Sequence, residues 1–348
     1  MREKSMPAPG CGGRLFRLVG LGLLLVAILL LILVVNQGIA LTRMRQRLPA
    51  PGESVTLNGR AYHLNCQGSG GPTVLIDAGN GSFSLEWTPS QQELSQTTRV
   101  CTFDRPGYGW SESSPDPRDG TQVVTELHEL LFTAGEAPPY VLVGHSLGGV
   151  HMRLYAAHYP QEVAGLILVD TAYPLTVSPE LAQQMQASIG FYQVMGLLTS
   201  SGILRILGPL AGEGMLPETA AKLPADLQST YLELLLDPAQ YRTAAAEMEQ
   251  LPQTFTQTEQ LLVGEQPFGQ LPLIVLTAGR QPAPGSSPFD PQTVPASTDW
   301  LAAGQTLASQ SERGEQRVVA ESGHLIHLDA PEAVQQAVLD VLAMIREP

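Results

Sequence analysis

Cysteine and basic residues are both scarce in this chain, and each shortage excludes a class of protein. The three cysteines, Cys11, Cys66 and Cys101, are too few for a disulfide scaffold, and no pair has zinc-ligand spacing. Residues 1–47 hold seven of the 19 basic residues and one of the 33 acidic ones. The remainder therefore carries a net charge of −20, which repels nucleic acid and anionic lipid, so we expect no nucleic-acid partner.

Charge is also absent from one long apolar run near the N-terminus. Leu18–Val35 contains no charged or strongly polar residue, and after two polar residues the apolar character continues to Leu41. A helix over residues 18–41, at about 1.5 Å per residue, is long enough to cross a hydrocarbon core of roughly 30 Å. We therefore predict a transmembrane anchor at 18–41, preceded by a short basic tail at 1–17.

A cleaved signal peptide is the alternative interpretation of this run, because Gly38-Ile39-Ala40 has small residues at a cleavage spacing. The run is longer than the roughly 7–15 apolar residues usual for such a peptide, which favours the anchor. Four basic residues precede the span and three follow it. This small bias is the only charge signal of orientation, and we expect the rest of the chain on the extracytoplasmic side.

The chain after the anchor alternates between strand-like and helix-like segments. Residues 42–53 are a polar, proline-containing linker, and Asn58-Gly59 is a two-residue hairpin signal. Runs of β-branched and other apolar residues, separated by helix-like stretches, predict a mostly parallel sheet that is covered on both faces. The runs are 73–78, 100–103, 140–143, 166–169, 273–276 and 317–320.

Strand signals are missing from residues 173–265, which are rich in Leu, Gln, Ala and Met. Several short helices opened by proline are expected there instead. We therefore predict a main domain over 54–172 and 266–348 that is interrupted by a helical insertion at 173–265.

A G-x-S-x-G pattern, Gly144-His145-Ser146-Leu147-Gly148, stands between a predicted strand and a predicted helix. A serine at such a sharp turn has a strained backbone, and the flanking glycines remove side chains that would collide. The hydroxyl then projects from the sheet edge near a helix N-terminus, which favours developing negative charge. The pentapeptide is common by chance, but this context favours Ser146 as a nucleophile.

A serine nucleophile needs a base, and seven histidines are available. His324 follows the last predicted strand and precedes the last predicted helix. That loop is at the carboxyl end of a strand, where open α/β sheets build their sites. We expect His324 to be the base, with His327 as its rival.

Residues 54–170 and 271–345 resemble the α/β-hydrolase superfamily. The matching segments are GHSLGG at 144–149, FDRPGYGWS at 103–111, DAGNG at 77–81 and SGHLIHLDAPE at 322–332. The resemblance implies an α/β-hydrolase fold: a mostly parallel eight-stranded sheet with helices on both faces and a helical cap after strand 6. It also implies that nucleophile, acid and histidine follow in that order along the chain.

Two further expectations come from the resemblance. The second and fourth strands of the family are neighbours, which would bring Cys66 near Cys101. They would form a disulfide in an oxidising compartment or remain two small buried side chains. The oxyanion-hole donors of the family correspond here to the N–H of Leu147 and, in the loop Ala78-Gly79-Asn80, the N–H of Asn80. Family members often have histidine at the first position of that loop.

The acid of the triad departs from the usual pattern. Many family members carry it in a G-x-x-D turn after the seventh strand, but residues 278–282 read AGRQP and contain no carboxylate. Either Asp170 at the end of the sixth strand supplies it, as in some lipases, or the loop 281–299 offers Asp290 or Asp299. We favour Asp170 because it ends a strand next to the nucleophile.

These residues predict a membrane-anchored serine hydrolase that cleaves a small or medium carboxylic ester through an acyl-enzyme, without cofactor or metal. Related epoxide hydrolases use an aspartate nucleophile, and Ser146 argues against that chemistry. An amidase, an aminopeptidase or an acyltransferase would use the same triad. A catalytically silent membrane-anchored binding protein is the alternative from another class.

Overall fold

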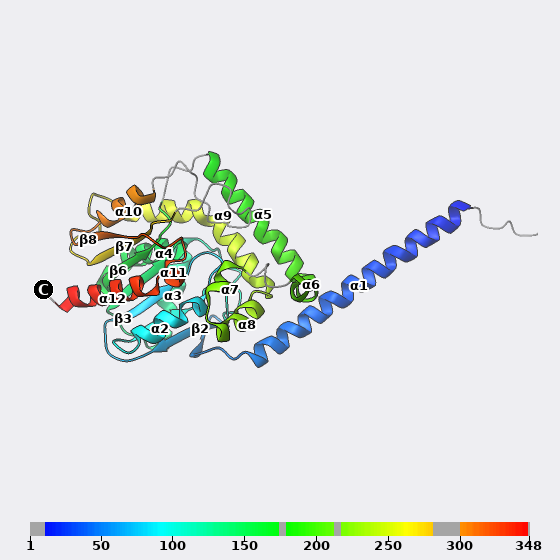
Figure 1. The fold of residues 1–348 in the computed structure, drawn as a ribbon, viewed down its shortest axis with the longest axis horizontal. Coiled ribbons are helices and arrows are strands. Elements are labelled where there is room, and N and C mark those ends of the chain that lie inside the picture. The colour runs from blue at the N-terminus through cyan, green and yellow to red at the C-terminus, as the bar shows by residue number, and fades with distance from the viewer. Residues whose placement is uncertain (1–10, 174–178, 212–216, 281–299, 347–348) are drawn as a thin grey trace, which may run out of the picture.

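The computed structural model describes residues 11–173, 179–211, 217–280 and 300–346. Within these ranges helices cover both faces of a central sheet, and one long helix, α1 (Cys11–Arg47), extends away from the rest of the molecule (Figure 1). The strands of the sheet are β1 (Glu53–Leu57), β2 (Arg60–Gln67), β3 (Thr73–Asp77), β4 (Val100–Phe103), β5 (Tyr140–His145), β6 (Val163–Val169), β7 (Leu273–Ala278) and β8 (Gly314–Val319).

The sheet has eight strands in the order β1-β2-β4-β3-β5-β6-β7-β8. β2 runs antiparallel to β1 and to β4, and the other pairs are parallel. Asn58 and Gly59 connect β1 to β2 with φ values of 49° and 78°. These positive values are what a two-residue hairpin turn needs. The predicted mostly parallel eight-stranded sheet is confirmed.

Successive side chains of the central strands are buried on opposite faces of the sheet. On β5, Leu142 belongs to the core on one face, whereas Val141 and Val143 belong to the core on the other. This burial on both sides explains why the strands are continuous apolar runs. Helices α3 (Gly120–Ala134), α4 (Leu147–His158) and α10 (Trp300–Ala308) cover the first face, and α2 (Thr88–Leu94) and α12 (Pro331–Arg346) cover the second.

The described part of the connection between β6 and β7 is mostly helical. We call its helices the inserted helices; they are α5 (Pro179–Ser200), α6 (Ile203–Ala211), α7 (Glu218–Lys222), α8 (Ala225–Leu234) and α9 (Pro238–Leu261). The short helices η1 (Ser84–Trp87), η2 (Pro160–Glu162) and α11 (Ile326–Asp329) lie in other connections. α9 runs through Pro252, because Leu251, Thr254 and Phe255 are buried and tertiary packing outweighs the propensity of proline to end a helix.

The N-terminal helix α1 is longer than the predicted span. It continues past Leu41 to Arg47, so the first half of the expected linker is helical. Residues 42–47 contain neither glycine nor proline, and Arg45 and Arg47 form ion pairs with Asp237 and Glu233 of the inserted helices and their connection. The helix stops just before Pro49, as expected from the restriction that proline places on the preceding residue.

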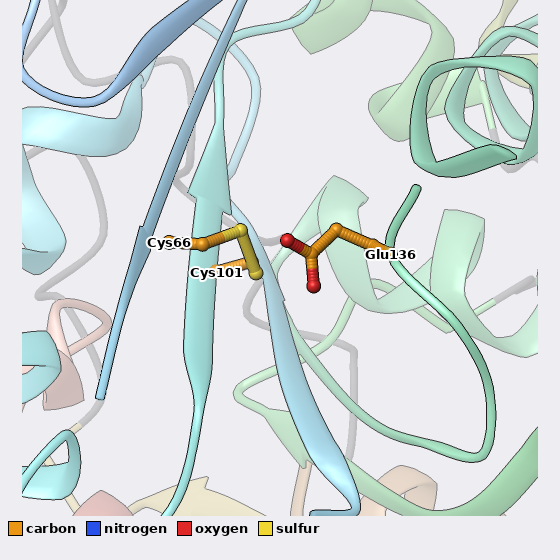
Figure 2. Close-up of side chains that lie close together, drawn as sticks. All are labelled: Cys66, Cys101 and Glu136. Carbon is orange, nitrogen blue, oxygen red and sulfur yellow. A yellow bond between two sulfur atoms is a disulfide. The ribbon is translucent and has the colours of Figure 1, made fainter. Parts of the chain in front are cut away.

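Cys66 on β2 lies directly opposite Cys101 on β4, and their sulfur atoms form a disulfide. The expectation that these two strands are neighbours is confirmed. Figure 2 shows the Glu136 carboxylate beside the two sulfur atoms. Both Glu136 oxygens accept hydrogen bonds from Arg99, and the sulfurs are bonded to each other. This group is therefore a disulfide beside an ion pair, and its atoms are not free to act as metal ligands.

Candidate active site

Ser146 lies at the junction between β5 and α4, with a φ of 52° that non-glycine residues rarely adopt. Two glycines allow this sharp turn. A Cβ added to Gly148 would lie 2.5 Å from the carbonyl oxygens of Asp77 and Ala78, and one added to Gly144 would lie 2.5 Å from the Gly148 carbonyl. The geometry at Ser146 therefore depends on both glycines lacking side chains.

The carboxylate of Asp170, just after β6, contacts the ring of His324. Asp170 Oδ2 lies 2.6 Å from His324 Nδ1. The other oxygen, Oδ1, accepts hydrogen bonds from the Ala278 N–H at 2.9 Å and from the Trp300 indole at 2.5 Å. Because a carboxylate only accepts, His324 Nδ1 carries the hydrogen in this pair. The Ala278 and Trp300 bonds thus fix the carboxylate, and the carboxylate orients the imidazole.

Backbone contacts bring Ser146 close to this pair. The Ser146 N–H donates to Val169 O at 3.0 Å, one residue before Asp170. The ring of His145, the residue before Ser146, lies 2.9 Å from the carbonyl oxygen of His324. His324 Nε2 is buried and has no hydrogen-bond partner among the residues that the structure describes. In the neutral ring this nitrogen is the one that can accept a proton.

Two further histidines, His145 and His327, lie near this pair but have other partners. Burial, followed by the nearby His327 and His324, lowers the pKa of His145 well below its ordinary value. His145 is therefore neutral and donates from Nε2 to the His324 carbonyl. His327 stacks on Trp87 with ring centroids 4.5 Å apart, and its Nε2 faces Glu86 rather than Asp170. Asp290 and Asp299 lie outside the described residues.

The loop after β3 lies against Ser146. A Cβ added to Gly79 would be 3.3 Å from the Ser146 Cβ, so the loop backbone passes beside the serine. The side chain of Asn80 donates to Ala244 O at 3.1 Å and to Glu247 Oε2 at 3.0 Å, both on the inserted helix α9. Leu147 is the first residue of α4, where backbone N–H groups have no partner within the helix.

The buried guanidinium of Arg105 holds this loop in place through hydrogen bonds. Arg105 donates to the carbonyl oxygens of Ala78 and Gly79 at 2.7 and 2.8 Å. It also forms ion pairs with Asp77 at the end of β3 and with Glu247 on α9. Glu247 in turn accepts from Tyr108 and, as above, from Asn80. One charged network therefore links an inserted helix to the loop beside Ser146.

The charges in this network stabilise one another. Burial, the largest single effect, would raise the pKa of Asp77 and of Glu247, but the charge of Arg105 and the hydrogen bonds to each carboxylate together outweigh it and lower both pKa values. Burial would likewise lower the pKa of Arg105, and the two carboxylates instead raise it well above its ordinary value. All three side chains are therefore ionised at neutral pH.

Sequence reasoning did not identify Arg105 or Glu247 as part of the site. Arg105 lies within the segment 103–111 that carries the family resemblance, so a signal was present. Glu247 stands in a helix with no local motif and meets Arg105 across 142 positions of the chain. A contact of that separation leaves no pattern in a single sequence.

Comparisons with known proteins agree with this fold. Residues 74–337 match the alpha/beta hydrolase family. YqjL, an uncharacterized protein of Bacillus subtilis, is 26% identical over 290 residues, which cover 83% of this chain and 91% of that protein. Human (lyso)-N-acylphosphatidylethanolamine lipase is 32% identical over 147 residues, 40% of this chain and 42% of the lipase. An uncharacterized Schizosaccharomyces pombe protein is 34% identical over 193 residues, 47% of this chain and 36% of that protein.

Solved structures of hydrolases share the architecture. A thermophilic esterase from Thermogutta terrifontis is 22% identical, with a TM-score of 0.59, and the match covers 84% of this chain and 98% of the esterase. The enol-lactonase of Burkholderia xenovorans is 18% identical, with a TM-score of 0.59, over 84% of this chain and all of the lactonase. The family match extends over more than half of the sequence, and this chain is therefore a hydrolase that belongs to the alpha/beta hydrolase family.

Proposed function

We propose that this hydrolase is a membrane-anchored serine esterase in which Ser146 is the nucleophile, His324 the base and Asp170 the acid. The observation that carries the proposal is the pairing of His324 Nδ1 with Asp170, which leaves a buried, unpartnered Nε2 close to the turn at Ser146. A neutral imidazole held in this tautomer is the base that a serine hydroxyl needs.

In this mechanism Ser146 Oγ attacks the ester carbonyl while His324 Nε2 takes the hydroxyl proton. Asp170 stabilises the imidazolium that forms, and the backbone N–H groups of Asn80 and Leu147 donate to the developing oxyanion. His324 then gives the proton to the departing alcohol, which leaves an acyl-enzyme on Ser146. Water, activated by the same histidine, releases the carboxylic acid.

A small or medium substrate fits the covered position of Ser146, whose side chain is only 9% exposed. The inserted helices lie directly over the loop after β3, because Asn80 bonds to α9 and Tyr192 of α5 packs against Gly81. A folded protein chain would have to displace these contacts to reach the serine. An ester with a short or flexible acyl group would not.

Anchoring by α1 is supported by its composition and exposure. The stretch Phe16–Arg47 is long and apolar enough to cross a membrane, and none of its most apolar window is buried in the rest of the protein. The Cys66–Cys101 disulfide supports an extracytoplasmic domain, since disulfides persist in oxidising compartments.

The test is labelling of the full chain in nanodiscs with a fluorophosphonate probe, which reacts with activated serines. We expect strong labelling of the parent, none of Ser146→Ala, and little of His324→Ala. Ser188→Ala is a matched control, because Ser188 is also buried but lies on α5, and it should label like the parent. A folded parent that resists the probe, or a Ser146→Ala variant that still reacts, would overturn the assignment.

A further inference from the structure

The corner between α5 and α6 packs against the apolar part of α1. A Cβ added to Gly202, between the two helices, would lie 2.8 Å from the carbonyl oxygen of Leu33. Beside it, the buried side chain of Gln37 accepts from Arg205 of α6 at 2.9 Å and donates to Leu236 O at 2.8 Å. Figure 1 shows α6 beside α1, with the N-terminal part of α1 projecting beyond it.

The position of this contact along α1 determines how deep in the membrane the contact would lie. The apolar run starts at Leu18, directly after Arg17, and the next charged residue is Arg43. A hydrocarbon core of about 30 Å takes roughly 20 helical residues, so a span that begins at Leu18 ends near Gln37. Leu33 is then about one helical turn inside the core boundary. Anything packed against the Leu33–Gln37 segment is therefore level with the membrane surface.

Exposed apolar side chains lie on both helices of the corner. Val194 and Leu197 on α5 are 54% and 72% exposed, and Ile206 and Leu207 on α6 are 48% and 52% exposed. Exposed apolar side chains grouped in this way mark a contact surface rather than ordinary solvent-facing positions.

The distribution of charged residues also favours a membrane contact at this corner. The sequence has no acidic residue between Glu180 and Glu213, and Arg205 is the sole charged residue in that stretch. Its guanidinium is bonded to Gln37 of α1. The α5–α6 stretch thus carries no negative charge of its own, and the Glu233 carboxylate of α8 beside it is paired with Arg205 and Arg47. Elsewhere the acidic surface of the domain would be repelled by anionic lipid headgroups.

We propose that the α5–α6 corner, through Val194, Leu197, Ile206 and Leu207, is a second membrane contact that inserts into the interfacial layer of the bilayer crossed by α1. This inference rests on the proposed anchoring by α1. The occupant of the surface is lipid, because the adjoining helix segment would itself lie in lipid. The contact holds the inserted helices, and with them the cover over Ser146, at a fixed height above the bilayer.

The experiment uses the full chain in two sets of nanodiscs, with phosphatidylcholine brominated either near the top of the acyl chains, at the depth of the corner, or near their middle, at the depth of Leu25. Bromine quenches tryptophan at its own depth. Single variants Leu207→Trp and Leu197→Trp report on the corner, and Leu25→Trp reports on the anchor. Val318→Trp is the matched control: Val318 is 52% exposed, as Leu207 is, but lies on the edge strand β8, far from α1 (Figure 1). Each added emission is measured against the parent, which has three tryptophans.

We expect brominated lipid to quench the tryptophans added at Leu207 and Leu197, and to leave the one added at Val318 unchanged. Quenching at Leu25 without quenching at Leu207 or Leu197 would overturn the corner contact and leave the anchor standing. No quenching at Leu25 would overturn the anchor and the inference with it. Fluorophosphonate labelling of the same samples reports on Ser146 separately, so a failure of the esterase proposal is distinguishable from a failure of this one.

Discussion

The two oxygens of Asp170 have different partners: Oδ2 pairs with His324 Nδ1, whereas Oδ1 is held by the Ala278 N–H and the Trp300 indole. Because only Oδ2 meets the histidine, replacing that atom alone tests the role of the acid. In Asp170→Asn the amide oxygen can keep the Oδ1 contacts, but the amide nitrogen cannot accept from His324.

We expect Asp170→Asn to fold normally and to lose about 10⁴-fold in kcat, the loss known for an amide in this position of a triad. Trp300→Phe, which removes one bond to Oδ1 and leaves the His324 pair, should lose much less. Steady-state hydrolysis of a chromogenic ester measures both. Near-normal activity of Asp170→Asn would move the role to Asp290 or Asp299.

Because the pKa of Glu247 is lowered by folding, the stability of the folded protein depends on pH. This carboxyl has a lower pKa in the folded protein than in the unfolded chain, so its contribution to stability is complete above its unfolded pKa. This contribution is lost as the pH falls through the folded value. Glu247→Gln should therefore unfold with a weaker dependence on acidic pH than the parent. At neutral pH it should lose about 3–5 kcal/mol, because Arg105 loses one of its two buried partners.

Urea unfolding at neutral and acidic pH measures this effect of Glu247→Gln. The control is Glu249→Gln on the same helix: Glu249 is exposed, so its replacement should change the free energy of unfolding by less than about 0.5 kcal/mol. Equal pH dependence in Glu247→Gln and the parent would contradict the assignment of a depressed pKa to Glu247.

Gly148 is a position where one methyl group should be costly. The added Cβ of Gly148→Ala would lie 2.5 Å from two backbone carbonyl oxygens, which cannot rotate away as a side chain would. We expect a loss of about 1–3 kcal/mol in stability and a larger loss of activity, since the turn at Ser146 must shift.

Gly190→Ala is the matched control for Gly148→Ala. Gly190 lies within α5 and has nothing within 4 Å of an added Cβ, so alanine should be neutral or stabilise by roughly 0.5–1 kcal/mol. Thermal unfolding compares the two variants. Equal midpoints for both would show that the turn tolerates a side chain.

The Cys66–Cys101 disulfide closes a loop with a sequence separation of 35. By the loop-entropy relation, replacing both cysteines by alanine should destabilise the domain by about 3–4 kcal/mol. Peptide mass mapping without reductant should recover one linked peptide from the membrane-extracted protein. Two free thiols in that material would contradict the disulfide, and with it one support for the extracytoplasmic position.

The sheet and the positions of Ser146, Asp170 and His324 follow from local sequence. Each of these residues comes directly after a strand or in the loop that follows one, and parallel strands bring such ends to one edge. The strand order implied by the family resemblance placed Cys66 near Cys101 and left open whether they form the disulfide that the structure contains.

The parts that the sequence did not reveal depend on contacts between distant segments. α9 continues through Pro252 because the residues around that proline are buried. The first half of the linker after Leu41 is helical, and its arginines meet acids nearly 200 positions away. Glu247 joins the loop beside Ser146 for the same kind of reason, and periodicity or spacing cannot register such pairs.

The last turns of α1 belong to the folded domain, which matters for proteolytic release. Met44 is 3% exposed, and with Leu48, Trp110 and Leu234 it lines a cavity of about 180 Å³. A cut after Ala40 would remove the apolar span but keep Met44 and both arginine pairs, and the α5–α6 corner would remain as a membrane contact. A cut after Arg47 would remove them and, with Met44 and Arg45, one wall of the cavity. The site of cleavage, rather than cleavage itself, therefore decides how much of this packing the released enzyme keeps.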